Sequence, residues 1–170
     1  MLALLALAAS TLSACTPTPE PTPTPTAAFA SEEEAFAAAE EVYRAYNDAL
    51  SQVDTSDPDT FEPLYALTTG GVNEADRESF SKMHAEGYVV SGKTQVIDFK
   101  GISASPERDE VVAITCLDVS DVAVVNSAGV SQVNPTRPDT YALELTFISQ
   151  FDDQLLLDSA KPIEDPTCEA

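Results

Sequence analysis

Basic residues are scarce in this chain of 170 residues. Lysine and arginine together number 8 against 29 aspartates and glutamates, which gives a formal net charge of −21 at pH 7. A surface of this charge repels phosphate backbones and anionic lipid head groups, so we expect neither nucleic-acid binding nor peripheral docking on a membrane. A need for solubility is enough to explain the excess of acidic residues. A cationic ligand or partner is compatible with it, but no sequence pattern points to one.

Residues that bind metals or act as nucleophiles are also few. The chain holds one histidine, His84, and three cysteines, which leave no zinc site of usual spacing. Asp54, Asp57 and Asp59 lack the glycine and the distal glutamate of a calcium loop, and Asp57 stands where it can cap a helix. The sequence has no glycine-rich phosphate loop, no Gly-x-Ser-x-Gly turn and no free nucleophilic cysteine beside a histidine. We therefore expect no metal and no cofactor.

The N-terminal segment is apolar. Its first fourteen residues contain no charge, proline or glycine, and the run from Leu2 to Ala9 is typical of a secretory signal, being too short to span a bilayer. The following Leu12-Ser13-Ala14-Cys15 resembles the lipobox of bacterial lipoproteins, which implies cleavage before Cys15 and a diacylglycerol on its sulfur. We therefore predict a signal peptide at 1–14 and a lipid anchor that holds the protein on the outer face of the cell membrane. No lysine or arginine precedes the apolar run, so we expect the true start to lie upstream of Met1.

Proline and threonine alternate from Thr16 to Thr26, and nothing in this segment can build a core. The composition predicts a polyproline II spacer within a disordered linker over 15–30. Residues 31–170 are then a length suited to one domain. In an exported protein, Cys116 and Cys168 predict a disulfide; the alternative is a buried free Cys116 on a strand and an exposed Cys168 on a loose tail.

Three helices are predicted in the first part of this domain. Ser31 and Glu34 form a capping box at the start of a long helix. The apolar face of this helix steps by three and four residues: Phe36, Ala39, Tyr43, Tyr46, Leu50 and Val53. Asp57-Pro58 begins a second helix before a break at Gly70-Gly71, and a third helix runs from Asn73 to Gly87.

Short runs rich in β-branched residues follow, separated by turn residues. They predict strands at 88–90, 95–99, 111–119, 122–125, 140–148 and 155–157. In the clearest of these, Tyr141, Leu143, Leu145 and Phe147 alternate with more polar residues and so place one face against a core. The spacing favours hairpin-linked antiparallel strands. Helices followed by strands define an α+β fold, in which the amphipathic first helix covers the sheet.

The order and lengths of these elements, with Tyr43 and Tyr46 on the first helix and the Asn47-to-Leu50 stretch at its end, resemble the nuclear-transport-factor-2-like (NTF2-like, or cystatin-like) superfamily. The resemblance implies helices packed on a curved antiparallel sheet that together form a cone. The superfamily includes isomerases, dehydratases and cyclases, which hold a carboxylate or histidine with tyrosines in the cone, alongside members that only bind. The chain also resembles poorly characterised lipoproteins of high-GC Gram-positive bacteria that combine a lipobox, a Pro/Thr spacer and one such domain.

Tyr43, Tyr46 and His84 are the candidate pocket residues. A histidine near the C-terminal end of a helix more often interacts with the helix dipole than acts as a base, and tyrosines at helical spacing are usually core. Two functions remain. We favour a non-catalytic module that binds a small apolar ligand or an envelope protein. The alternative is a proton-transfer enzyme, with His84 or a buried carboxylate as base and Tyr43 or Tyr46 as hydrogen-bond donor.

Overall fold

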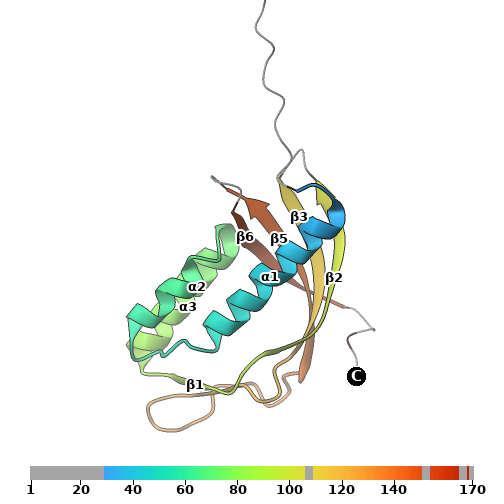
Figure 1. Ribbon diagram of the computed structural model, residues 1–170. Coiled ribbons are helices and arrows are strands. Elements are labelled where there is room, and N and C mark those ends of the chain that lie inside the picture. The colour runs from blue at the N-terminus through green and yellow to red at the C-terminus, as the bar shows by residue number, and fades with distance from the viewer. Residues whose placement is uncertain (1–28, 106–108, 151–153, 165–167, 169–170) are drawn as a thin grey trace, which may run out of the picture.

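The protein consists of helices packed on one side of a curved antiparallel sheet (Figure 1). The computed structural model describes residues 29–105, 109–150, 154–164 and 168. The predicted signal peptide, Cys15 and most of the predicted linker lie outside the described residues. No helix in the described ranges is both long and apolar enough to cross a membrane. The predicted α+β class is confirmed, with the helices on the sheet as the NTF2-like resemblance implies.

The sheet has the strand order β2-β3-β5-β6, with every neighbouring pair antiparallel. Its strands are β2 (Gln95–Ser105), β3 (Glu110–Asp118), β5 (Thr140–Ser149) and β6 (Leu155–Ile163). Strands β1 (Val89–Ser91) and β4 (Ala123–Val125) form a separate two-stranded ribbon. Both β2 and β6 run well beyond the predicted 95–99 and 155–157. Their later residues carry little apolar signal, yet the backbone ladder to β3 and β5 continues through them.

Helix α1 (Glu32–Leu50) lies across the sheet (Figure 1). Its start follows the prediction at Ser31, whose hydroxyl accepts a hydrogen bond from the Glu34 amide at 3.2 Å. The Glu34 carboxylate reaches one residue further back than in the predicted capping box and accepts from the Ala30 amide at 2.8 Å. The face that is fully buried steps by four residues: Ala35, Ala39, Tyr43 and Asn47. The predicted Phe36 is only partly buried, and its ring covers β2 at Gly101, where a Cβ would lie 2.2 Å from the ring.

The remaining helical segments are the 3-10 turn η1 (Pro58–Phe61), α2 (Glu62–Tyr65) and α3 (Gly70–Glu86). The predicted break at Gly70-Gly71 is wrong, because both glycines belong to the first turn of α3. The Thr69 amide donates to the Leu157 carbonyl at 2.9 Å, so the chain is held by β6 before the helix begins. Gly87 ends α3 in the left-handed conformation, as predicted, with φ of +66°.

One apolar cluster fills the space between α1 and the sheet, and a second packs the helical segments together. The larger joins Ala39 and Tyr43 of α1 to Leu145 and Phe147 of β5, which are fully buried, and to Leu157 of β6. The second cluster packs η1, α2 and α3 together through Phe61, Leu64, Tyr65 and Phe80. The alternation predicted for β5 is therefore present, since Leu145 and Phe147 face the helices.

The predicted disulfide joins Cys116 to Cys168, with the two Cα atoms 5.4 Å apart. Cys116 pairs with Ala142 in the ladder between β3 and β5, on the opposite face of the sheet from α1. Ala142 and Ile163 pack against the bridge there. The disulfide therefore attaches the C-terminal segment to the outer face of the sheet, and the alternative of two free cysteines is ruled out.

Candidate functional site

Tyr43, one of the predicted pocket residues, is part of the filled interior. Its side chain is 2% exposed, and its ring centroid lies 6.1 Å from that of Phe99, which lies 6.3 Å from Phe147. Burial raises the pKa of Tyr43 to about 12, an effect that the Asn47 side chain partly offsets. These aromatic rings fill the region between α1 and the sheet.

Tyr46 meets a carboxylate that the sequence analysis did not single out. Its phenol donates to Asp76 of α3, with distances of 3.3 Å to Oδ1 and 3.2 Å to Oδ2. Asp76 is partly buried, and desolvation raises its pKa to about 6, although the hydrogen bond from Tyr46 lowers it. Burial is also the main cause that raises the pKa of Tyr46, followed by the charge of Asp76. The pair connects α1 to α3 across a partly desolvated interface.

Asp76 could have been found from spacing. Val72, Asp76 and Phe80 are four residues apart on α3, so a carboxylate stands on the helix face that carries the buried Phe80. The prediction missed it because the surrounding residues of α3 are mostly charged and no single acid stands out.

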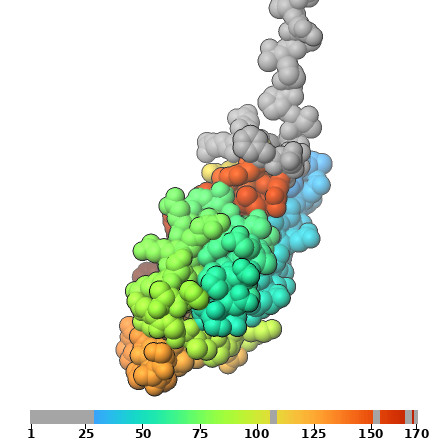
Figure 2. Space-filling view, turned by 90° about the vertical axis from the view of Figure 1, so that its left-hand side faces the viewer, coloured from blue at the N-terminus to red at the C-terminus, as the bar shows by residue number. Residues whose placement is uncertain are grey.

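His84 lies away from this pair. It is eight residues, or about 12 Å of helix, from Asp76. Its Nδ1 is 2.8 Å from the Thr55 carbonyl oxygen, and since a carbonyl only accepts, Nδ1 donates. The exposed ring lines an open groove of about 400 Å³ between α2 and α3 together with Arg77, whose guanidinium lies 4.0 Å from the centroid of the Tyr65 ring. Figure 2 shows the molecule from the side on which α2 and α3 lie. The structure therefore separates His84 from the two candidate tyrosines.

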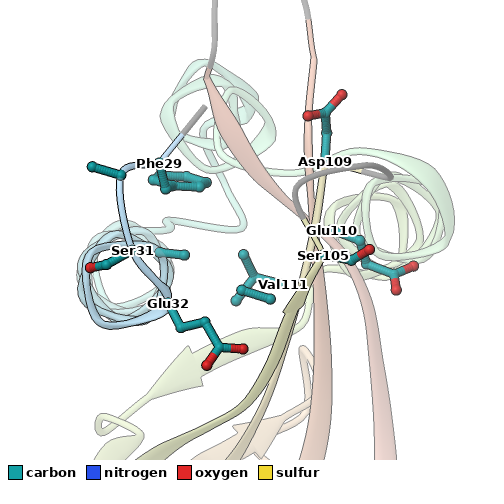
Figure 3. A pocket seen from close by; sticks show the side chains of 10 residues that line it. Phe29, Ser31, Glu32, Ser105, Asp109, Glu110 and Val111 are labelled. Carbon is teal, nitrogen blue, oxygen red and sulfur yellow. The ribbon is translucent and has the colours of Figure 1, made fainter. Parts of the chain in front are cut away.

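A more enclosed cavity, of about 240 Å³, lies at the N-terminal end of α1 (Figure 3). We call it the end cavity. Its apolar wall is made by Phe29, Ala30, Ala35, Ala104 and Val111, and its polar rim by Ser31, Glu32, Ser105, Asp109 and Glu110. In Figure 3 the Phe29 ring and the Val111 side chain border the space between α1 and β3. The cavity thus forms where the first helix diverges from the ends of β2 and β3.

No group of three or more histidine, cysteine, aspartate or glutamate side chains suited to a metal occurs among the residues that the structure describes. Two of the three aspartates considered above, Asp54 and Asp57, bind the local backbone through their carboxylates. The Asp57 side chain caps η1 by accepting from the Asp59 amide at 3.2 Å, and the Asp54 carboxylate accepts from the Ser56 amide at 2.9 Å.

No protein-family model matches the sequence. No curated protein matches it either. Solved structures do resemble it in fold. The intermembrane space region of the chloroplast protein ARC6 superposes with a TM-score of 0.52 at 14% identity, covering 76% of this chain and 97% of that one. At such identity the similarity concerns the fold alone.

Two further structures are similar at lower scores. Aln2 from a Streptomyces species has a TM-score of 0.46 at 14% identity and covers 79% of this chain and 93% of its own. A protein of Novosphingobium aromaticivorans, proposed to be an aromatic ring hydroxylase, has a TM-score of 0.49 at 15% identity, with coverages of 74% and 85%. Neither score supports an argument about function.

Proposed function

We propose that this protein is a non-catalytic binding module for a small apolar ligand, held on the outer face of the cell membrane by a lipid on Cys15. The main observation in support of this proposal is the end cavity. Five of its lining residues are apolar, and two of these, Ala35 and Val111, are 1% exposed and belong to the main core. An apolar cavity with rigid walls is the usual form of a small-ligand site.

The filled interior supports binding rather than catalysis. A proton-transfer site needs a base that a substrate can reach. Tyr43 is enclosed by Phe99 and other core residues, and His84 lies on a different part of the surface. The end cavity, in contrast, has no histidine among its lining residues, and its wall offers mainly methyl groups and one aromatic ring.

The disulfide supports the proposed location on the outer face of the cell membrane. A bridge between Cys116 and Cys168 persists in oxidising surroundings such as those outside the cytoplasm, where lipoproteins reside. Phe29, which lines the cavity, is fourteen residues from Cys15. Even fully extended, this stretch would hold the cavity within about 50 Å of the lipid. The ligand would therefore be met close to the membrane.

The direct test is binding to residues 15–170 with Cys15→Ser, which retains every described residue. Toluene and indole should bind saturably in calorimetric titration. Ala104→Phe, which fills the cavity, should remove that binding, whereas Ala37→Phe on the exposed face of α1 should not. Equal binding by the two variants would place the ligand elsewhere. No saturable binding to the unmutated chain would leave the outer sheet face and an envelope protein partner as the functional alternative.

One observation favours the enzymatic alternative. The pair of Tyr46 and Asp76 combines a phenol donor with a carboxyl group whose pKa of about 6 suits a general base. An enzyme of this kind would exchange a proton at the carbon beside a carbonyl group. Deuterium exchange into a panel of cyclic ketones, catalysed by the unmutated chain and abolished by Asp76→Asn, would support it. Exchange that is unaffected by Asp76→Asn would exclude this pair.

A further inference from the structure

The rim of the end cavity constrains the charge of the ligand. We propose that the site selects a small cationic amphiphile, with one aromatic ring or a short alkyl chain in the cavity and a protonated amine at its rim. This inference rests on the proposed function and adds to it the chemical class of the ligand.

The size of the cavity limits the apolar part. A dry cavity of about 150 Å³ is large enough to bind benzene, while pockets for drug-sized ligands begin near 300 Å³. At about 240 Å³, the end cavity has room for a single ring with a short arm. The side chains of Phe29, Ala35 and Val111, which line this space, contain only carbon and hydrogen, so the inner part of the ligand is apolar.

The rim determines the polar part. Glu32, Asp109 and Glu110 are all acidic, and the lining residues include no lysine, arginine or histidine. In Figure 3 the Glu32 carboxylate lies on the same side of the strands as the cavity, whereas the Glu110 side chain extends to their other side and the Asp109 side chain points upward. Glu32 is therefore the group that can pair with a ligand ammonium, and the other two contribute through their longer-range field.

The charge of the whole chain acts in the same direction. A net charge of −21 raises the local concentration of cations at the surface and lowers that of anions. A fatty acid or an aromatic acid of suitable size would meet repulsion on approach and at Glu32. An amine with the same apolar group would be attracted both during its approach to the protein and by Glu32 at the cavity.

Three probes with a common phenyl ring test the inference on residues 15–170 with Cys15→Ser: 2-phenylethylamine, 2-phenylethanol and 3-phenylpropionate. The amine should bind about three- to fivefold more tightly than the alcohol, with the acid weakest, because an exposed ion pair contributes about 1 kcal/mol or less. Raising the salt concentration to about 0.5 M should narrow the difference between amine and alcohol.

Glu32→Gln should lower the affinity for the amine at least threefold and leave that for the alcohol unchanged. Glu33→Gln is the matched control, since it removes the same charge from the neighbouring, exposed position that does not line the cavity. Equal losses in both variants would overturn the assignment to Glu32. Equal binding of amine and alcohol, still abolished by Ala104→Phe, would overturn the cationic class while the proposed function stands. Failure of all three probes to bind would overturn both.

Discussion

The phenol of Tyr46 donates to the carboxylate of Asp76, at 3.2 Å from Oδ2, and so connects α1 to α3. In this setting the carboxylate is stabilised by one hydrogen bond but has lost part of its hydration. The second effect is larger, because the pKa of Asp76 is raised to about 6. Ionisation of Asp76 at neutral pH therefore lowers the free energy of unfolding of the protein.

Asp76→Asn should stabilise the protein at pH 7 to 8. The folded-state pKa lies above the ordinary value of 3.8, so the contribution of Asp76 to stability is fully present below pH 4 and is lost as pH rises through 6. The gain from the substitution should appear over that interval and reach about 1–2 kcal/mol, since partial exposure screens the effect. Urea unfolding at pH 4 and pH 7.5 measures it. Glu74→Gln, at an exposed position of α3, should show no such pH dependence.

Tyr46→Phe should have the opposite effect at neutral pH. It removes the donor to Asp76 but keeps the ring, so the carboxylate is left with less compensation for its burial. We expect a loss of about 1–3 kcal/mol at pH 7 and a higher pKa for Asp76. Urea unfolding gives the first value and NMR titration of the carboxyl carbon the second. An unchanged carboxyl titration would show that the hydrogen bond does not form in solution.

Adjacent glycines at the start of α3 should respond differently to alanine. Gly70 has φ of +48°, and a Cβ there would lie 2.1 Å from Oδ1 of Asp158, so Gly70→Ala should destabilise the protein by about 1–3 kcal/mol. At Gly71 the nearest atom is the Asp158 carbonyl oxygen at 3.8 Å. Gly71→Ala should therefore be neutral or stabilise by up to about 1 kcal/mol, owing to helix propensity. Thermal unfolding of the two variants provides the comparison, and equal effects would contradict the helix start at Gly70.

Removal of the disulfide should lower stability substantially. Cys116 and Cys168 are 52 residues apart, for which the chain-entropy model gives about 4 kcal/mol. We expect Cys116→Ala with Cys168→Ala to lose about 2–4 kcal/mol in urea unfolding. Adding a reductant should weaken the unmutated chain but leave the double variant unchanged. If the reductant destabilised the unmutated chain and the double variant equally, its effect would not come from reduction of the Cys116–Cys168 disulfide.

Features that depend on neighbouring residues were predictable from the sequence, whereas those that depend on distant ones were not. The Ser31 cap and the Gly87 terminator are local signals, and both were predicted. The start of α3 was not, because it depends on the hydrogen bond from Thr69 to Leu157, far along the chain.

The candidate site was likewise only partly predictable, because it combines residues that are distant in the sequence. Tyr46 was identified as a pocket candidate, but its partner Asp76 comes from another helix. The end cavity joins the start of α1 to Ala104 and Val111 of the sheet. Phe29, which lies within the predicted linker at 15–30, lines this cavity and packs against the core. The composition of the predicted linker could not indicate that its Phe29 forms part of the wall of the end cavity.

The lipid anchor has its own test. Expressed in a bacterium that processes lipoproteins, the full-length protein should gain the mass of a diacylglycerol on Cys15, lose residues 1–14 and fractionate with the membrane. Cys15→Ser should abolish both the added lipid mass and the cleavage. A protein that stays with the membrane as Cys15→Ser would be held there by something other than this lipid.

NMR mapping of residues 15–170 with Cys15→Ser decides whether the end cavity binds a small apolar group. On titration with toluene, the signals of Phe29, Ala104 and Val111 should shift saturably and together, and Ala104→Phe should abolish the shifts. Saturable shifts at Ile114 and Ile148, which lie on the outer face of the sheet, with none at Val111, would show that the end cavity is not the binding site.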